Sequence, residues 1–178
     1  TSTVVILLFS GGVIYFLSGA KLRFFGISAM IGLVVIGALI YFTPYRLNRV
    51  MGFLNKDANT QGTNYHLNQA LIAIGSGEAT GMGYGKSTAK INYLPAVVDD
   101  SIFAVVGQEL GFVGAGFLVL LFGMLVFRIF WLAMRMRDKF GKLMLAGFGA
   151  IIAFQSLVNM GAISGLLPLT GVPLPFIS

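Results

Sequence analysis

The sequence predicts an all-α fold: a polytopic membrane helix bundle with four transmembrane spans and one long polar loop, in a single membrane domain of 178 residues. Two observations support this prediction. Hydrophobic residues make up 57% of the chain and charged residues only 10%, whereas charged residues make up about 25% of an ordinary soluble domain. The apolar residues also form long uncharged stretches, and roughly 17 to 25 such residues cross a bilayer as a helix. This pattern excludes a water-soluble fold.

The expected spans cover residues 3–19, 24–43, 102–127 and 143–167. The first two are separated by Lys21 and Arg23, and Pro44 ends the second because proline interrupts the helical hydrogen-bond ladder. A basic turn, 128–142, is expected between the last two spans. The terminal loop, 168–178, contains three prolines and is expected to be non-helical. Because the chain lacks an initial Met and stops directly after this loop, we expect a fragment of a longer protein.

The long polar loop, 44–101, lies between the second and third spans. Within it, residues 65–74 carry apolar side chains at positions 67, 70, 71 and 74. This spacing predicts a short helix that is half-buried at the membrane interface. Five glycines between positions 75 and 85 predict irregular backbone in the segment that follows.

The residue content excludes several kinds of site. Cysteine is absent and His66 is the only histidine, so the chain has no disulfide, no thiolate nucleophile and no Cys- or His-rich metal site. The segment 81–88, Gly-Met-Gly-Tyr-Gly-Lys-Ser-Thr, is not a nucleotide-binding P-loop, because Thr80 stands where that motif requires its first glycine. We interpret the segment as a flexible glycine-rich turn.

The basic residues predict the topology. A net charge of +6 would suggest nucleic acid as a partner of a soluble protein, but basic residues of membrane proteins accumulate on cytoplasmic loops. The two short loops hold seven of the twelve basic residues and one acid, whereas the long loop holds five basic residues, four acids and the histidine. We therefore expect the short loops and Trp131 at the cytoplasmic side, the long and terminal loops outside, and no nucleic-acid partner.

Polar side chains inside the expected spans are candidates for function. Glu109 is an acid in an apolar span, where it is expected to face a cavity or a partner. Gly107 and Gly111 flank it at a spacing that allows close helix approach. Two interpretations remain open: a structural hydrogen bond across the bundle, or a direct role with substrate or protons. Gln155 and Asn159 lie on one helix face and serve either interhelical hydrogen bonds or a ligand.

Charged residues at the two ends of the long loop form a second group. Arg46 and Arg49 lie where the outer headgroups begin, so they contact headgroups or form a phosphate site for an anionic lipid substrate. Asp99 and Asp100 directly precede the third span. They could cap that helix and interact with its dipole, or one of them could act as a general base on a lipid-anchored substrate.

Two stretches at this point resemble the signature of the FtsW/RodA/SpoVE family: Tyr-Leu-Pro-Ala-Val-Val-Asp-Asp-Ser-Ile-Phe-Ala at 93–104 and Gly-Gln-Glu-Leu-Gly-Phe at 107–112. Further stretches follow in the order that the family has, at 44–50, 65–73, 81–87, 165–171 and 174–178. Colinear agreement over residues 44–178 is far more specific than any one motif.

The resemblance implies a multi-pass protein of the bacterial cytoplasmic membrane with about ten spans, of which this chain would hold the sixth to the ninth. Family members are peptidoglycan glycosyltransferases. They polymerise lipid II, the undecaprenyl-pyrophosphate-linked disaccharide peptide, into glycan strands for cell division or cell-shape elongation. A class B penicillin-binding protein transpeptidase is the protein partner that the resemblance implies, and membrane lipids surround the helices.

The resemblance also assigns residues. The essential Asp of the family falls on Asp100, but Val98, Asp99 and Ser101 surround it in place of the usual His, Thr and Phe, and Ala96 replaces a frequent Glu. Asp99 could therefore share the role of Asp100 or shift the assignment by one residue.

In the implied reaction, Asp100 deprotonates the acceptor sugar hydroxyl, which attacks the anomeric carbon of the donor, and undecaprenyl pyrophosphate leaves. The charge of the leaving group requires a cation, and the candidates on the outer side are Arg46, Arg49, Lys86 and Lys90. Gln69 and Glu109 complete the expected substrate-binding set. No cofactor is evident, and a divalent cation could supply the charge, although no ligand motif supports one.

Two alternative functions fit the same sequence. A flippase or transporter for a lipid-linked precursor would also contain an intramembrane acid and polar helix faces. A non-catalytic membrane scaffold that recruits a transpeptidase would need neither aspartate.

Overall fold

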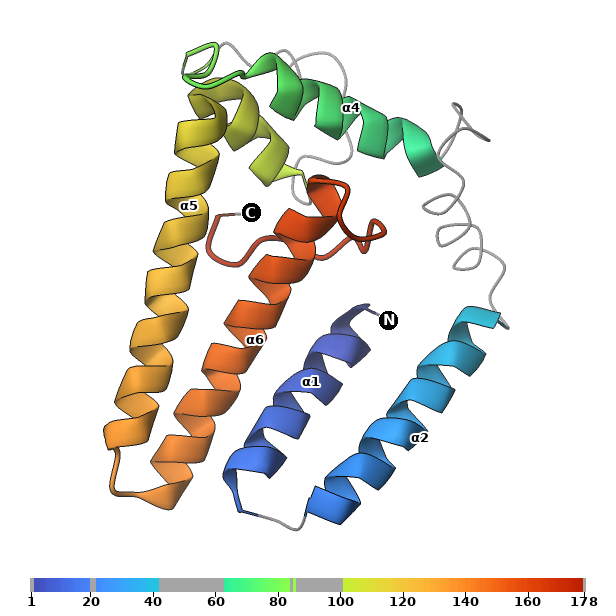
Figure 1. Cartoon of the computed structure of the whole chain (residues 1–178), viewed down its shortest axis with the longest axis vertical. Helices are drawn as coiled ribbons and strands as arrows, with labels where there is room; N and C mark the ends of the chain where they lie inside the picture. Colours follow the sequence, from blue (N-terminus) through green and yellow to red (C-terminus); the bar gives the residue numbers. More distant parts are fainter. Residues whose placement is uncertain (1, 20–21, 42–62, 84, 86–100, 178) are drawn as a thin grey trace. The chain divides into compact units, whose positions relative to one another are not determined.

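The computed structural model describes residues 2–19, 22–41, 63–83, 85 and 101–177. All regular secondary structure in these ranges is α-helical, which confirms the predicted all-α class. The helices are α1 Ser2–Leu17, α2 Leu22–Tyr41, α4 Thr63–Ser76, α5 Ile102–Arg135 and α6 Lys139–Ile163 (Figure 1). The short helix expected at 65–74 is therefore present as α4, which ends at Ser76 and leads directly into the glycine-rich segment.

Two of these helices are long and apolar enough to cross a membrane: α5, with 34 residues, and α6, with 25. Only 11% and 39% of their most apolar stretches are buried, so most of these apolar side chains do not face a core within the chain. α1 is a shorter apolar helix of 16 residues, and α2 has 20 residues. Apolar surface of this extent requires an apolar environment around it.

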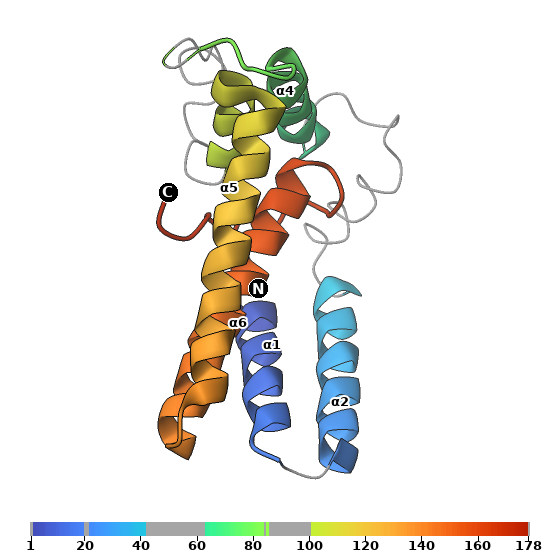
Figure 2. The same ribbon diagram turned by 60° about the vertical axis from the view of Figure 1, so that its left-hand side comes forward.

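Contacts divide the chain into two compact units, unit 1 with residues 1–47 and 122–154 and unit 2 with residues 48–121 and 155–178. In unit 1, α1 lies beside the first half of α6 in both views (Figures 1 and 2). The rings of Phe9 and Phe154 stack with their centroids 4.4 Å apart. Gly147 allows this close packing, because a Cβ atom at that position would collide with the side chain of Ile14.

The turn between α5 and α6 is much shorter than the basic turn predicted at 128–142. α5 continues to Arg135, and α6 already begins at Lys139. The prediction treated charge as the end of the helix, but Arg and Lys are good helix formers whose long side chains reach water from a helix end. Asp138 caps α6, because its carboxylate accepts hydrogen bonds from the backbone N–H groups of Gly141 at 2.8 Å and Phe140 at 3.4 Å.

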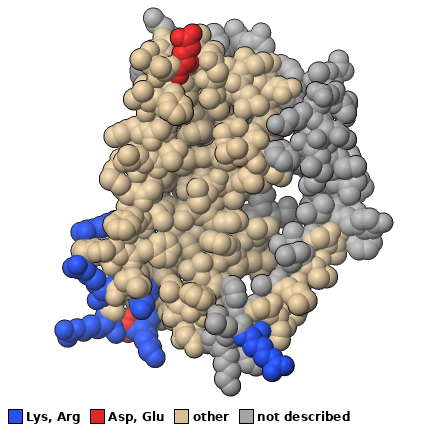
Figure 3. Space-filling view, in the orientation of Figure 1, with Lys and Arg blue, Asp and Glu red and all other residues tan. Residues whose placement is uncertain are grey.

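Basic side chains gather at this end of unit 1 (Figure 3). The guanidinium groups of Arg128 and Arg135 lie over the ring of Trp131, with their carbon atoms 4.5 and 3.7 Å from its centroid. This cation–π arrangement holds both charges next to an aromatic residue of the type that prefers the membrane surface. The cluster consists of Arg128, Arg135, Arg137, Lys139 and Lys142.

In unit 2, α6 ends at Ile163, before the boundary of 167 expected for the fourth span. Gly165 adopts a positive φ of 75°. Its N–H donates to the carbonyl of Ala162, and the N–H of Leu166 donates to that of Gly161. This is the Schellman arrangement, which satisfies the last carbonyls of a helix and turns the chain away from its axis. The terminal loop follows without regular structure, as predicted.

Candidate functional site

The candidate site in unit 2 is organised around a break in α5. Gly111 has φ 67° and ψ −167°, which no helical residue adopts, so α5 consists of a short arm, residues 102–110, and a long arm, residues 112–135. The span predicted at 102–127 therefore contains a break in its helix, which the sequence did not indicate. Glu109 consequently lies at the end of the short arm, two residues before the break, and not in the middle of a continuous helix.

The break separates four backbone groups that an unbroken helix would pair. The N–H groups of Phe112 and Val113 would donate to the carbonyls of Gln108 and Glu109. In the structure, a glycine loop, residues 77–83, provides partners for all four groups. Phe112 N–H donates to Glu78 O at 2.9 Å and Val113 N–H to Ala79 O at 3.2 Å, while Gln108 O accepts from Met82 N–H at 3.0 Å and Glu109 O from Gly83 N–H at 3.1 Å.

Glycine is required on both sides of this contact. A Cβ atom at Gly77 would collide with the carbonyl of Gly107, and one at Gly81 with the carbonyl of Glu109. A Cβ atom at Gly111 would lie 2.6 Å from the carbonyl oxygen of Ala79, and both Gly81 and Gly111 have positive φ. The backbones of the loop and the short arm are therefore in direct contact.

This contact changes the interpretation of Gly107 and Gly111. Their spacing predicted the close approach of another helix. At Gly107 that helix is α4, through Ile74, whereas at Gly111 the glycine loop makes the close contact. Gly77 and Gly81 have the same four-residue spacing as Gly107 and Gly111, but other glycine pairs of the chain share it, so the spacing alone does not identify the partner segment.

A side-chain hydrogen bond fixes the short arm to α4. Nε2 of Gln108 donates to Oγ of Ser76 at 3.1 Å, and Oγ of Ser76 donates to the carbonyl of Ala73 at 2.8 Å. Gln108 is only 3% exposed. The buried face of α4, formed by Leu67, Ala70 and Ala73, completes the packing of unit 2.

Glu109 carries the unusual polar group of the site. Its side chain is 8% exposed, and its Oε1 atom is buried without a hydrogen-bond partner among the described residues. A buried polar atom without a partner costs roughly 1–3 kcal/mol. The structural hydrogen bond across the bundle, one of the two interpretations of this residue, is thus not made by Oε1 within the described part of the chain.

The start of the short arm bears on the two adjacent aspartates. Ser101 is 4% exposed, and its carbonyl accepts hydrogen bonds from the N–H groups of Ala104 at 2.9 Å and Val105 at 3.4 Å. Because the helix begins at Ile102, Ser101 occupies the N-cap position. Asp99 and Asp100 lie outside the described residues, so both interpretations of them, helix capping with dipole interaction and general-base catalysis, stay predictions.

Most residues predicted for the site lie outside the described residues. Gln69 lies on α4 and is half-buried, and Glu109 lies at the break as described above. Among the described side chains, no group of three or more His, Asp and Glu residues could hold a metal ion. The predicted residues outside the described ranges are Arg46, Arg49, Lys86, Lys90, Asp99 and Asp100.

Gln155 and Asn159 have a structural role that differs from the one predicted. Nδ2 of Asn159 donates to the carbonyl of Val172 at 2.7 Å, and Nε2 of Gln155 donates to that of Pro173 at 2.9 Å. The two amides thus bind successive carbonyls of the terminal loop. Leu174, the next residue, is fully buried.

Comparisons with known proteins agree with the resemblance noted in the sequence. The family model FTSW_RODA_SPOVE, described as "Cell cycle protein", matches residues 1–178. A "Probable peptidoglycan glycosyltransferase FtsW" of Buchnera aphidicola subsp. Schizaphis graminum is 37% identical over 99% of this chain and 51% of its own length. "Stage V sporulation protein E" of Bacillus subtilis is 37% identical over 93% of this chain and 45% of its own length.

A solved structure shares the fold. It is described as "Structural coordination of polymerization and crosslinking by a peptidoglycan synthase complex" and superposes with a TM-score of 0.76 at 26% identity. The superposition covers 99% of this chain and 49% of the solved one. This chain therefore spans about half the length of the proteins that it matches. Because the family model matches every residue, the chain belongs to the FtsW/RodA/SpoVE family.

Proposed function

We propose that the full-length protein is a peptidoglycan glycosyltransferase of the bacterial cytoplasmic membrane that polymerises lipid II into glycan strands for cell division or cell-shape elongation. The observation that carries this proposal is family membership over residues 1–178, together with 37% identity over 99% of the chain to a relative named as a probable enzyme of this kind. The apolar helices α5 and α6 support the membrane location. Four spans in this chain, with the long and terminal loops outside, are part of the proposal.

The catalytic residue in this proposal is Asp100. A general base must be held within reach of the proton that it removes, and small displacements are costly. The residue that follows Asp100, Ser101, begins a short arm that is fixed by backbone hydrogen bonds to the glycine loop and by the bond between Gln108 and Ser76. This fixed start of the short arm supports the proposal that the carboxylate of Asp100 is held in position to act as the general base.

The remaining assignments are proposals for substrate binding. Arg46, Arg49, Lys86 and Lys90 would stabilise the pyrophosphate of the leaving group, because its charge grows as the glycosidic bond to the lipid breaks. Gln69 on α4 and Glu109 at the break would contact the sugar or peptide parts of lipid II. The buried carboxyl of Glu109 supports this role, since its Oε1 atom lacks a partner among the described residues.

A class B penicillin-binding protein transpeptidase is the proposed partner. The similar solved structure is described as coordinating polymerization and crosslinking, and crosslinking is the reaction of a transpeptidase. The glycan strand made by one protein would then be crosslinked by the other.

The test is lipid II polymerisation by the purified full-length protein and its Asp100→Ala and Asp99→Ala variants. We expect Asp100→Ala to abolish polymer formation and Asp99→Ala to leave most of it. Unchanged polymer output from Asp100→Ala would refute the assignment, and equal losses in both variants would show that the two aspartates act together. Transfer of labelled lipid II across vesicles without polymer would instead favour a flippase.

A further inference from the structure

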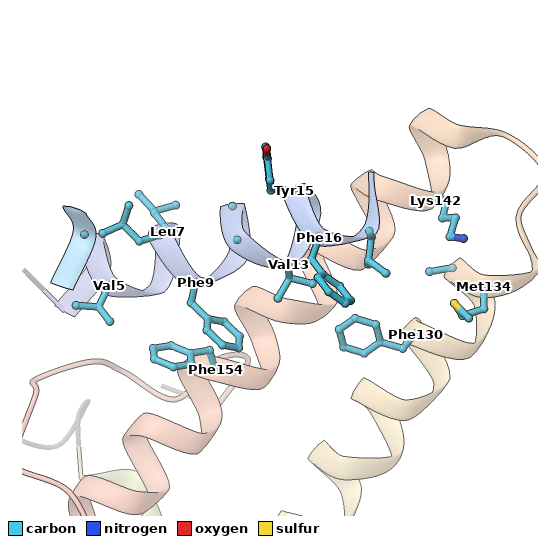
Figure 4. A pocket seen from close by; sticks show the side chains of 16 residues that line it. Val5, Leu7, Phe9, Val13, Tyr15, Phe16, Phe130, Met134, Lys142 and Phe154 are labelled. Carbon is cyan, nitrogen blue, oxygen red and sulfur yellow. The ribbon is translucent and has the colours of Figure 1, made fainter. Parts of the chain in front are cut away.

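The terminal loop differs from the rest of the apolar surface in the state of its backbone. Apolar side chains on a helix can face lipid, as those around α1 in unit 1 can, where Phe9, Phe130 and Phe154 are among the residues that line a pocket (Figure 4). In unit 2, residues 168–174 have no regular secondary structure. Their backbone N–H and C=O groups are therefore not paired in the way that a helix pairs them.

The terminal loop runs back beside α6. After α6 ends at Ile163 the chain reverses, and the loop lies beside the last turns of the helix in both views (Figures 1 and 2). The bond from Asn159 fixes the carbonyl of Val172 four residues before the end of α6. The bond from Gln155 fixes that of Pro173 eight residues before it. The two carbonyls therefore lie about 6 and 12 Å back along the helix, at about 1.5 Å per residue.

The length of α6 relates these positions to the membrane. The helix has 25 residues, or about 37 Å, and the hydrocarbon core is about 30 Å thick. By the topology predicted from charge, Lys139 and Lys142 in the first turn belong to the cytoplasmic headgroups. Residues 143–163, about 31 Å long, then span the core and bring Ile163 to its outer boundary. The middle of the terminal loop would accordingly lie below the outer headgroups.

Irregular backbone at this depth cannot face lipid. Each unpaired N–H or C=O group in hydrocarbon costs several kcal/mol, so such segments occur only where protein covers them or water reaches them. The two faces of the loop differ in this respect. Val172 and Leu174 are 5% and 0% exposed, so protein covers their face, whereas Gly171 and Pro173 at the alternate positions are exposed. The exposed face is the one that requires water.

The loop adjoins the elements of the proposed reaction. A Cβ atom at Gly165, directly before the loop, would lie 3.5 Å from the side chain of Leu71, so the chain packs against α4 there. The end of α4 is bonded through Ser76 to Gln108 of the short arm, which follows Asp100 in the sequence. A lipid-linked sugar that reacts near this arm needs a hydrated approach from the outer side. The exposed face of the loop belongs to the same unit and is suited to line that approach.

We propose that the terminal loop re-enters the membrane beside α6 and that its exposed face, Gly171 and Pro173, lines a water-filled recess for the polar head of the lipid-linked sugar substrate. Gln155 and Asn159 are positioning residues, because their amides hold the loop at this depth. The recess rests on the membrane location of α6, whereas the identity of its occupant rests on the proposed function.

The absence of cysteine from the chain makes thiol accessibility a direct test. Single cysteines are introduced into the full-length protein, from which any other cysteine has been removed, and sealed vesicles are treated with a charged, membrane-impermeant thiol reagent. Pro173→Cys should react at least about tenfold faster than Leu157→Cys, because only a hydrated thiol forms the reactive thiolate. Leu157 is the matched control, since it lies on α6 between the two amides and is 67% exposed. Thr80→Cys, exposed on the glycine loop, gives the rate outside the membrane, and labelling after denaturation gives the total thiol.

A second pair of variants tests the amides. Val172→Cys should be unreactive, because this side chain is buried. Adding Asn159→Leu removes the donor to the Val172 carbonyl at similar side-chain volume, so the loop should be released and the thiol should become reactive. Ser164→Ala, which loses only bonds to carbonyls of its own helix, should leave the thiol unreactive. A thiol that stays unreactive with Asn159→Leu would show that this amide does not hold the loop.

Protection by substrate identifies the occupant. In the Asp100→Ala background, which is expected to bind lipid II without polymerising it, lipid II should slow the labelling of Pro173→Cys, and the same concentration of phosphatidylglycerol should not. Labelling of Pro173→Cys as slow as that of Leu157→Cys would overturn the recess, and labelling that lipid II does not slow would overturn its occupant. Polymer formation by Asp100→Ala would instead refute the proposed reaction, and the labelling of the recess would stand.

Discussion

Replacing Gly111 by alanine tests the central feature of unit 2. Alanine tolerates neither the φ of 67° nor the contact with Ala79, so the favourable response is a straight α5. Straightening restores the two helical bonds of Phe112 and Val113 but removes all four bonds to the glycine loop. The net loss is two hydrogen bonds. At about 1 kcal/mol for each bond that is lost without replacement, the folded state is destabilised by about 2 kcal/mol.

Amide hydrogen exchange resolves this outcome at individual residues. In the Gly111→Ala variant of the full-length protein, we expect the amides of Met82 and Gly83 to exchange about thirtyfold faster, the factor that corresponds to about 2 kcal/mol. The amides of Phe112 and Val113 should stay protected, because they pair with carbonyls of their own helix after straightening.

Gly116→Ala is the matched control, since Gly116 lies in the long arm and a Cβ atom there meets no other atom. That variant should leave the exchange of the glycine loop unchanged and stabilise the helix slightly. Unchanged exchange at Met82 and Gly83 in Gly111→Ala would refute the reasoning, because it would mean that the loop does not depend on the break.

Three further changes have expected outcomes. Ser76→Ala removes the acceptor of Gln108 Nε2 and should lower the free energy of unfolding by about 1 kcal/mol, measured as a fall in the thermal midpoint. Ser18→Ala, which loses only an exposed bond within its own turn, should leave the thermal midpoint unchanged. Asp138→Ala removes the cap of α6 at a cost of about 1 kcal/mol and should accelerate amide exchange in its first turn, and Asp138→Asn should restore protection. Asn159→Ala releases the buried carbonyl of Val172, so limited proteolysis should cleave the terminal loop faster than in the wild-type protein.

The elements that the sequence predicted well are those specified by local pattern. Periodic apolar residues identified α4, and the glycines between positions 75 and 85 identified irregular backbone. Hydropathy also located α1, α2, α5 and α6 along the chain, although it misplaced several ends. The continuation of α5 to Arg135 was missed because a hydropathy scale measures the cost of placing a charged side chain in lipid. It does not measure the helix propensity of Arg, which is high.

The features that the sequence did not predict depend on contacts between distant segments. A glycine inside an apolar stretch is compatible with a straight helix, and only the partner loop at 77–83 makes the break at Gly111 favourable. The amides of Gln155 and Asn159 were expected to join helices, since no local signal indicates that two carbonyls of the terminal loop lie opposite them. Asp100 itself was selected by family resemblance, because adjacent acids before a helix are compatible with capping as well as catalysis.

The break and the proposed catalytic residue are connected through the short arm. Ser101 and Gly111 are ten residues apart, about 15 Å at the helical rise, so a rotation of only about 4° at Gly111 would move Ser101 by about 1 Å. A displacement of that size at a catalytic group reduces the rate by about a hundredfold. If Asp100 is the general base, Gly111→Ala should therefore reduce lipid II polymerisation by at least that factor, although Gly111 carries no side chain that could bind substrate. The decisive result is full polymerisation by a Gly111→Ala variant in which amide exchange shows that the glycine loop has detached. That result would show that the break at Gly111 does not position Asp100 and that the base is held by something other than the short arm.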